Sequence, residues 1–363
     1  MMTRTKTTNM PTTPTATRPT TKTTTISDAA SAESDWRPDL LDGFEQTTIP
    51  LGSGILPGEV GLRATLVRRT LDADPERDRR ERAVISLPGW NDYFFHTHVA
   101  AFFEAQGITF YALDPRRSGR SLGDPARRDY AGSLGDHAEE LDAAYEFVSA
   151  RHASVVLMGH STGGLIAALW ASDRPGRLAG LVLNSPWLAM WGPPGYPTAL
   201  LPTLTALTSR DPLWELPLPD PGDRYASCVH ASGAGEWDYD RDLKASGRVP
   251  VRAGWLRAVL LAQRRTASGL AIDAPVFMAA GTRSHLRARG YSERDRRSDI
   301  VLDVDAIAAK APKLGRSVTL VRIADGFHDL TLSVPDARKA YFAELARWLA
   351  AYVPPQRSAD RRE

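Results

Sequence analysis

The chain has 363 residues, of which 42% are hydrophobic and 24% are charged, a composition typical of a water-soluble protein with room for a large core. Its formal net charge of +2 gives no sign of a nucleic-acid-binding surface, and no apolar run approaches the roughly 18 residues that a membrane span requires. The single cysteine, Cys228, excludes an internal disulfide and a cysteine-based zinc site. These features predict a cytoplasmic protein and leave its oligomeric state open.

The N-terminal segment differs in composition from the rest of the chain. Residues 1–27 carry four basic residues and no acidic one, and 13 of the first 25 residues are threonine. With so few large apolar side chains, burial cannot offset the entropy that ordering costs, so we predict a disordered tail over residues 1–35. At the other end, residues 355–363 are predicted to form a short charged tail.

Between the tails, short β-like runs alternate with helical patterns. The first run, 60–71, predicts a long strand, and the charged run 76–82 after it is interpreted as a solvated hairpin tip. The later runs are short and apolar, as in parallel sheets that are covered on both faces. We expect strands at 83–87, 108–113, 154–158, 180–184, 275–280 and 317–323, and helices at 98–106, 135–151, 162–172, 304–314 and 335–352. The alternation predicts an α/β fold with a mostly parallel central sheet flanked by helices.

Residues 189–271 interrupt this alternation with many prolines and tryptophans. We interpret them as a cap inserted between two strands, with helices possible at 200–207 and 252–266. The cap would divide the core into residues 36–188 and 272–354. Two tryptophans in or beside the cap, Trp187 and Trp191, are predicted to bind an apolar part of a substrate, although tryptophans here can equally form the core of the cap.

The strongest local signal is Gly159-His-Ser161-Thr-Gly163, which lies between a predicted strand and a predicted helix. In this pattern the turn is so tight that small residues are needed two places before and after the serine. The serine hydroxyl then stands above the sheet, at the positive end of the helix dipole. We therefore predict that Ser161 is a nucleophile.

A serine nucleophile requires a base, and the base requires an acid that orients it. His328 follows the last predicted strand, at the edge of the sheet where catalytic residues collect, and is the candidate base. No carboxylate directly follows the strand at 275–280, and the next candidates are Asp299 and Asp303. Asp299 has a suitable position in the topology, whereas Asp303 is also explained as the first residue of a helix.

Five motifs together resemble the α/β-hydrolase superfamily, in particular its serine aminopeptidase S33-like and monoacylglycerol-lipase/lysophospholipase-like branch. The resemblance covers roughly residues 44–352. The motifs are Leu87-Pro-Gly-Trp-Asn-Asp-Tyr93, Leu113-Asp-Pro-Arg-Arg-Ser-Gly-Arg-Ser121, Gly159-His-Ser-Thr-Gly-Gly164, Ser298-Asp-Ile-Val-Leu-Asp303 and Gly326-Phe-His-Asp329.

The resemblance implies more than the separate motifs do. It favours Asp299 over Asp303 as the acid, with the stretch 283–298 as an insertion that the family pattern lacks. It also implies an oxyanion hole made by the backbone N–H groups of Trp90 and Thr162. Pro88 stands where the family usually has histidine, but the donor lies further along the chain, so the missing N–H of proline does not remove it. No metal or organic cofactor is implied.

These residues lead to three hypotheses. The first is a hydrolase of a small-molecule carboxylic ester that has an apolar group. The second is an aminopeptidase or amidase, because the same residues serve both reactions, and the acidic run 236–242 would then bind an amine instead of forming a solvated loop. The third is a catalytically silent binding protein on the same fold, which an intact Ser161 and His328 disfavour.

Overall fold

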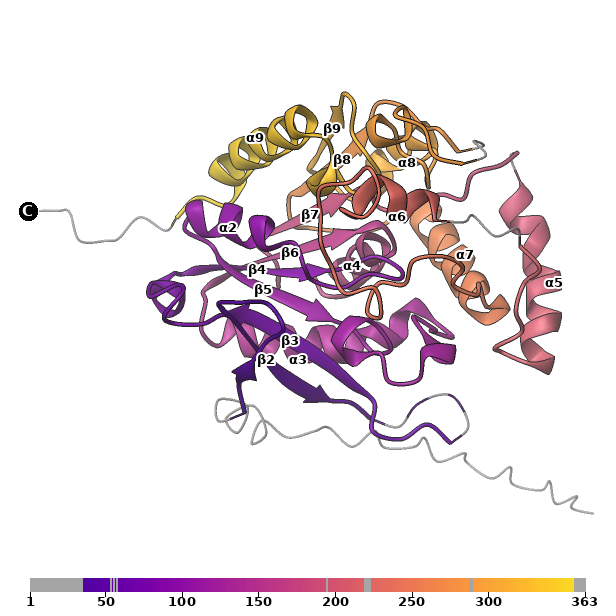
Figure 1. The fold of residues 1–363 in the computed structure, drawn as a ribbon, viewed down its shortest axis with the longest axis horizontal. Coiled ribbons are helices and arrows are strands. Elements are labelled where there is room, and N and C mark those ends of the chain that lie inside the picture. Colours follow the sequence, from indigo (N-terminus) through magenta and orange to yellow (C-terminus); the bar gives the residue numbers. More distant parts are fainter. Residues whose placement is uncertain are drawn as a thin grey trace, which may run out of the picture. The chain divides into compact units, whose positions relative to one another are not determined.

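The computed structural model describes residues 35–355 apart from 53, 55, 57, 194, 219–222 and 287–289. The predicted tails, 1–35 and 355–363, lie outside this part of the chain except for Asp35 and Pro355. In the described residues, nine strands form one sheet in the order β1-β2-β3-β5-β4-β6-β7-β8-β9 (Figure 1). The strands are β1 (Arg37–Pro38), β2 (Phe44–Pro50), β3 (Arg63–Arg69), β4 (Arg82–Leu87), β5 (Thr109–Asp114), β6 (Ser154–His160), β7 (Gly180–Asn184), β8 (Val276–Gly281) and β9 (Val318–Ile323).

The sheet is mostly parallel, which confirms the predicted fold class. The six strands from β5 to β9 run in the same direction, while β1, β2 and β3 join them through antiparallel pairs. β5, β7 and β8 are buried along their whole length, as expected of apolar strands that are covered on both faces. The carboxyl ends of the six parallel strands therefore meet at one edge of the sheet, where ligands bind in folds of this class.

Helices cover both faces of the sheet. Val156 of β6 belongs to a core cluster with residues of α2 and α9, whose side chains Phe102 and Phe342 pack with ring centroids 4.6 Å apart. Leu157, the next residue of β6, is equally buried and points to the opposite face, where α3 and α4 contact the strands. No helix in the described residues is long and apolar enough to cross a bilayer. The helices around the sheet are α2 (Thr97–Ala105), α3 (Ala138–Ser149), α4 (Ser161–Asp173), α8 (Val304–Ala308) and α9 (Pro335–Tyr352).

The charged run 76–82 is not a hairpin tip, so that prediction is wrong. The strands that it joins, β3 and β4, are not neighbours, because β5 lies between them. Arg77 is only 2% exposed and donates a hydrogen bond to Glu45 Oε1 at 2.6 Å, while its carbonyl accepts one from Thr109 Oγ1 at 2.6 Å. A charged run can thus be buried when each guanidinium finds an acceptor. The predicted strand 60–71 is also shorter in the structure, where β3 begins at Arg63.

The segment that the sequence predicts to be a cap lies between β7 and β8. It contains α5 (Tyr196–Arg210), α6 (Arg224–Val229) and α7 (Ala253–Ser268). α5 and α7 run side by side at the right of Figure 1, where Arg257 Nε donates a hydrogen bond to Thr205 Oγ1 at 3.1 Å. This segment belongs to the same compact unit as the sheet.

Part of this segment, residues 238–247, is bonded to the loop after β4 and is called the strap below. Lys244 Nζ lies 2.6 Å from Asp92 Oδ1, and the two side chains are only 6% and 4% exposed. Beside this ion pair, Asn91 Nδ2 donates to Ala245 O at 2.9 Å and Asn91 Oδ1 accepts from Ala245 N at 3.0 Å. The loop after β4 is therefore held by contacts with a segment about 150 residues away in the sequence.

The buried ion pair generates a stability prediction. Removing one partner leaves an uncompensated buried charge, which typically costs about 3–5 kcal/mol. We therefore expect Lys244→Met to lower the free energy of unfolding by about 3 kcal/mol, measured by urea unfolding of the full chain. The double variant Asp92→Asn/Lys244→Met should lose less than the sum of the two single variants, because neither charge remains unpaired. Additive losses would contradict the pairing.

Candidate active site

Ser161 stands at the sharp turn between β6 and α4, as the sequence predicts. Its φ of +52° lies in the left-handed region that non-glycine residues rarely adopt. Both flanking glycines are required by close packing. A Cβ atom at Gly163 would lie 2.1 Å from the carbonyl oxygen of Pro88, and one at Gly159 would lie 2.6 Å from the carbonyl oxygen of Gly163. Both distances are far inside van der Waals contact, so any larger residue would force the turn apart.

Three of the predicted side chains form a continuous hydrogen-bonded chain. His328 Nε2 lies 3.1 Å from Ser161 Oγ, and His328 Nδ1 lies 2.9 Å from Asp299 Oδ2. An ionised carboxylate can only accept hydrogen bonds, so Nδ1 carries the proton and Nε2 is left to accept the proton of the serine hydroxyl. All three residues are buried, at 7% exposure for Ser161, 4% for His328 and 0% for Asp299. Solvent therefore screens these interactions weakly.

The second oxygen of Asp299 is bonded to the backbone. Asp299 Oδ1 accepts hydrogen bonds from the N–H groups of Val301 and Leu302 at 2.8 and 2.7 Å. These bonds fix the orientation of the carboxylate and offset the cost of burying its charge. Asp303, the alternative acid, instead caps α8, where its Oδ1 accepts from the N–H groups of Asp305 and Ala306 at 3.1 and 3.0 Å.

The insertion before Asp299 is a folded loop with its own ion pairs. Ser284 and Asp299 form an isolated β-bridge, so the two ends of the insertion lie side by side. Inside it, the fully buried carboxylate of Asp295 lies 2.6 Å from Arg224 Nη2 of α6 and 2.6 Å from His285 Nδ1. The insertion therefore contacts the segment between β7 and β8 while leaving Asp299 at the sheet edge.

A second histidine, His160, packs beside His328, with the two ring centroids 4.8 Å apart. Burial lowers the pKa of His160 to about 4, so its ring is neutral at pH 7. Asp329, the neighbour of His328 in sequence, does not contact the ring from behind. Its Oδ1 accepts hydrogen bonds from Asn184 Nδ2 at 2.7 Å and Thr331 Oγ1 at 2.7 Å, which attaches the His328 loop to the end of β7.

The predicted oxyanion donors lie on the two segments that meet at Ser161. A Cβ atom at Gly89 would lie 3.2 Å from Ser161 Cβ, so the backbone just before Trp90 abuts the serine. The N–H of Trp90 donates no hydrogen bond to any residue that the structure describes. Thr162 is the second residue of α4, and the first four N–H groups of a helix have no partner within the helix. Both groups are placed as the sequence predicts.

The predicted substrate-binding tryptophans have different surroundings. Trp187 N donates to Ser161 O at 3.0 Å, and the indole N–H of Trp187 is buried without a partner among the described residues. Its ring centroid lies 5.7 Å from that of Trp255 on α7, which in turn lies 5.3 Å from that of Trp90. Trp191, by contrast, is 44% exposed. The structure therefore brings Trp187 to the serine, while the role of Trp191 stays a prediction.

Sequence reasoning missed the buried polar cluster behind the loop after β4. In the described residues, one group could hold a metal ion, because Asp92, His96 and Asp329 offer ligand atoms within 4.8 Å of one another. The Lys244 ammonium already lies 2.6 Å from Asp92, however, and supplies the positive charge that this carboxylate requires. No local pattern marks this cluster, since its members come from three distant segments.

Residues 78–332 match the family described as serine aminopeptidase, S33. The chain is also 31% identical over 134 residues to a monoacylglycerol lipase from Mycolicibacterium smegmatis, across 36% of this chain and 44% of that one. It spans less than half of the length of the curated relatives that it matches.

Solved structures share the fold at low identity. A thermostable carboxyl esterase from Bacillus coagulans, in complex with glycerol, aligns with a TM-score of 0.60 at 15% identity over 86% of this chain and 99% of that chain. A monoacylglycerol lipase from Paleococcus ferrophilus aligns with a TM-score of 0.56 at 20% identity over 75% and 96%. The fold and the family match confirm the resemblance drawn from the motifs, and the chain belongs to the serine aminopeptidase S33 family of α/β-hydrolases.

Proposed function

We propose that the protein is a serine hydrolase that cleaves a carboxylic ester through an acyl-enzyme intermediate. The observation that carries this proposal is the buried chain of hydrogen bonds from Ser161 through His328 to Asp299. A nucleophile bonded to a base, with the base oriented by an acid, is the arrangement that acyl transfer needs. The same connections disfavour the silent binding protein, for which no reason to retain all three bonds is apparent.

The reaction proceeds in two halves. Ser161 Oγ attacks the ester carbonyl carbon while His328 Nε2 takes the hydroxyl proton, and Asp299 stabilises the imidazolium that forms. His328 then gives the proton to the oxygen of the leaving alcohol, and the carbon–oxygen bond of the ester breaks. In the second half a water molecule attacks the acyl-enzyme, His328 takes its proton and returns it to Ser161 Oγ, and the carboxylic acid leaves.

The negative charge that develops on the carbonyl oxygen requires hydrogen-bond donors. The N–H groups of Trp90 and Thr162 supply them in this proposal, with Gly89 packed against Ser161 and α4 directing the positive end of its dipole at the same place. Loss of one such donor typically costs about 10²–10³ in kcat. Pro88 does not weaken the arrangement, because its carbonyl packs on Gly163 and its missing N–H is not used.

Two observations favour an ester with an apolar group over a peptide. Trp187 and Trp255 form an aromatic wall beside the serine, and the unpartnered indole N–H of Trp187 can donate to a polar atom of the substrate. In the acidic run 236–242, Glu236 lies 3.4 Å from Arg296 Nη2 and 3.3 Å from Arg338 Nη2, so this carboxylate is not free to bind a substrate amine. The relatives named as lipases and an esterase agree with this choice.

The first prediction concerns the nucleophile. A fluorophosphonate probe should label the wild-type protein, and Ser161→Ala should abolish labelling and reduce ester hydrolysis by about 10⁶-fold in kcat. Ser172→Ala, at the other end of α4, is the matched control and should behave as the wild type. An unlabelled wild type, or labelling that survives Ser161→Ala, would rule out the enzyme.

The second prediction separates the two candidate acids. Asp299→Asn should lower kcat by about 10³–10⁴-fold, because an amide cannot hold His328 in the required tautomer. Asp303→Asn should leave kcat near the wild-type value, since asparagine caps a helix as well as aspartate does. Steady-state kinetics on one activated ester decide between them. Full activity in Asp299→Asn would show that the acid is assigned wrongly.

The third prediction concerns the substrate. Activated esters of graded acyl chain length should be cleaved with a higher kcat/KM than aminoacyl anilides that carry the same leaving-group chromophore. For esters, kcat/KM should rise by at most about fourfold per buried methylene. Trp187→Ala should reduce the preference for long acyl chains more than it reduces the rate on the shortest ester. Faster cleavage of the anilides would favour the aminopeptidase instead.

A further inference from the structure

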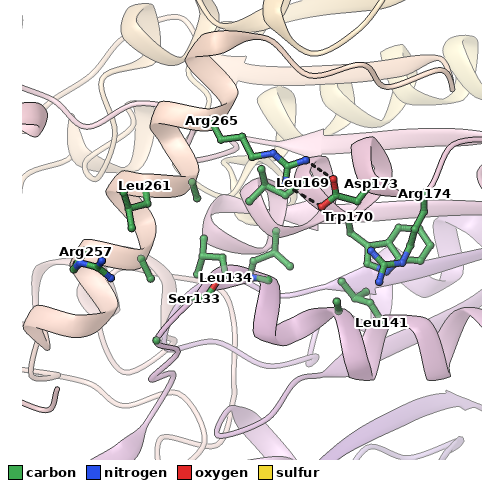
Figure 2. A pocket seen from close by; sticks show the side chains of 16 residues that line it. Ser133, Leu134, Leu141, Leu169, Trp170, Asp173, Arg174, Arg257, Leu261 and Arg265 are labelled. Atoms are coloured by element: carbon green, nitrogen blue, oxygen red, sulfur yellow. Dashed lines mark hydrogen bonds and ion pairs between the residues drawn. The ribbon is translucent and has the colours of Figure 1, made fainter. Parts of the chain in front are cut away.

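A pocket separate from the serine lies between α4, α7 and the chain before α3 (Figure 2). Its volume is about 290 Å³, near the lower limit for pockets that hold small molecules. The floor is apolar and consists of side chains that are 8% exposed or less. They are Leu134, Leu141, Ile166, Leu169, Trp170 and Ala258.

Arginine side chains border this floor on several sides, as Figure 2 shows. Two of them are paired with carboxylates, Arg265 with Asp173 and Arg174 with Asp142. The third, Arg257, donates one hydrogen bond to the neutral Thr205 Oγ1 at 3.1 Å and has no carboxylate partner among the residues that the structure describes. The pocket therefore combines an apolar floor with one guanidinium whose charge is not balanced by a neighbouring acid.

We propose that this pocket binds a small amphipathic carboxylate, with the alkyl chain on the apolar floor and the carboxylate on Arg257. A guanidinium matches a carboxylate in a planar, two-bond geometry, and such charge-assisted bonds are stronger than neutral ones. At about 30 Å³ per water-sized volume, the 290 Å³ cavity accommodates roughly the ten non-hydrogen atoms of octanoate. Alkyl carboxylates are also the class of product that the proposed function releases, and this one reason rests on that function.

The wall of the pocket also contacts the active site. α7 contributes Arg257 and Ala258 to the pocket, while Gln263 of the same helix donates through Nε2 to Trp187 O at 2.9 Å. Trp187 in turn donates to the carbonyl of Ser161. A bound carboxylate therefore contacts the helix that supports the aromatic wall beside the serine, without entering the site of ester cleavage.

The test is photo-crosslinking of the full-length protein with a diazirine-bearing octanoate, with the labelled residues located by tandem mass spectrometry. We expect saturable labelling on α7 between Ala258 and Ala262 and on the second half of α4, displaced by octanoate and not by octanol. Arg257→Gln should weaken displacement by octanoate about tenfold, the effect of losing one charge-assisted hydrogen bond.

Arg264→Gln is the matched control, because Arg264 is an exposed arginine of the same helix that does not line the pocket. It should bind octanoate as the wild type does, and circular dichroism should show both variants folded. Labelling confined to the surroundings of Ser161, or equal displacement in Arg257→Gln and the wild type, would overturn the proposal. The readout needs no turnover, so its failure is distinct from failure of the proposed function.

Discussion

The close approach of two backbone segments at Ser161 is the steric constraint on which the rest of the site depends. Gly163 packs so tightly on the carbonyl of Pro88 that no side chain fits between them, and this contact holds the serine in its left-handed conformation. The same contact brings the backbone before Trp90 against the serine. One packing requirement thus places the nucleophile, the start of α4 and one oxyanion donor together.

The remaining groups reach the serine because of the direction of the strands. The His328 loop follows β9, the loop that bears Asp299 follows β8, and the loop of Trp90 follows β4, all at the carboxyl edge of the parallel sheet. Long-range bonds then attach these loops to one another, as Asp329 bonds to Asn184 and Lys244 to Asp92. The geometry of the site is therefore set by the sheet and secured by buried polar contacts.

The sequence was sufficient to predict the parts that have a local signature. The apolar strands, the glycine pattern around Ser161 and the loop position of His328 each follow from short-range rules. The edge strand β2 was missed because its residues Phe44–Pro50 are mostly polar and only half-buried. The buried position of Arg77 and the pair of Lys244 with Asp92 were also missed, since both depend on partners that are far away in the sequence. Pattern reasoning cannot supply such partners.

The bridge between Ser284 and Asp299 has a consequence for how this enzyme family can vary. Because the insertion leaves the sheet edge and returns to it at neighbouring residues, the number of residues between those two points does not affect where the acid stands. The entropy of closing a longer loop grows only slowly with its length. Evolution can therefore lengthen, shorten or replace this loop to reshape the surroundings of the site, while Asp299 and His328 keep their geometry.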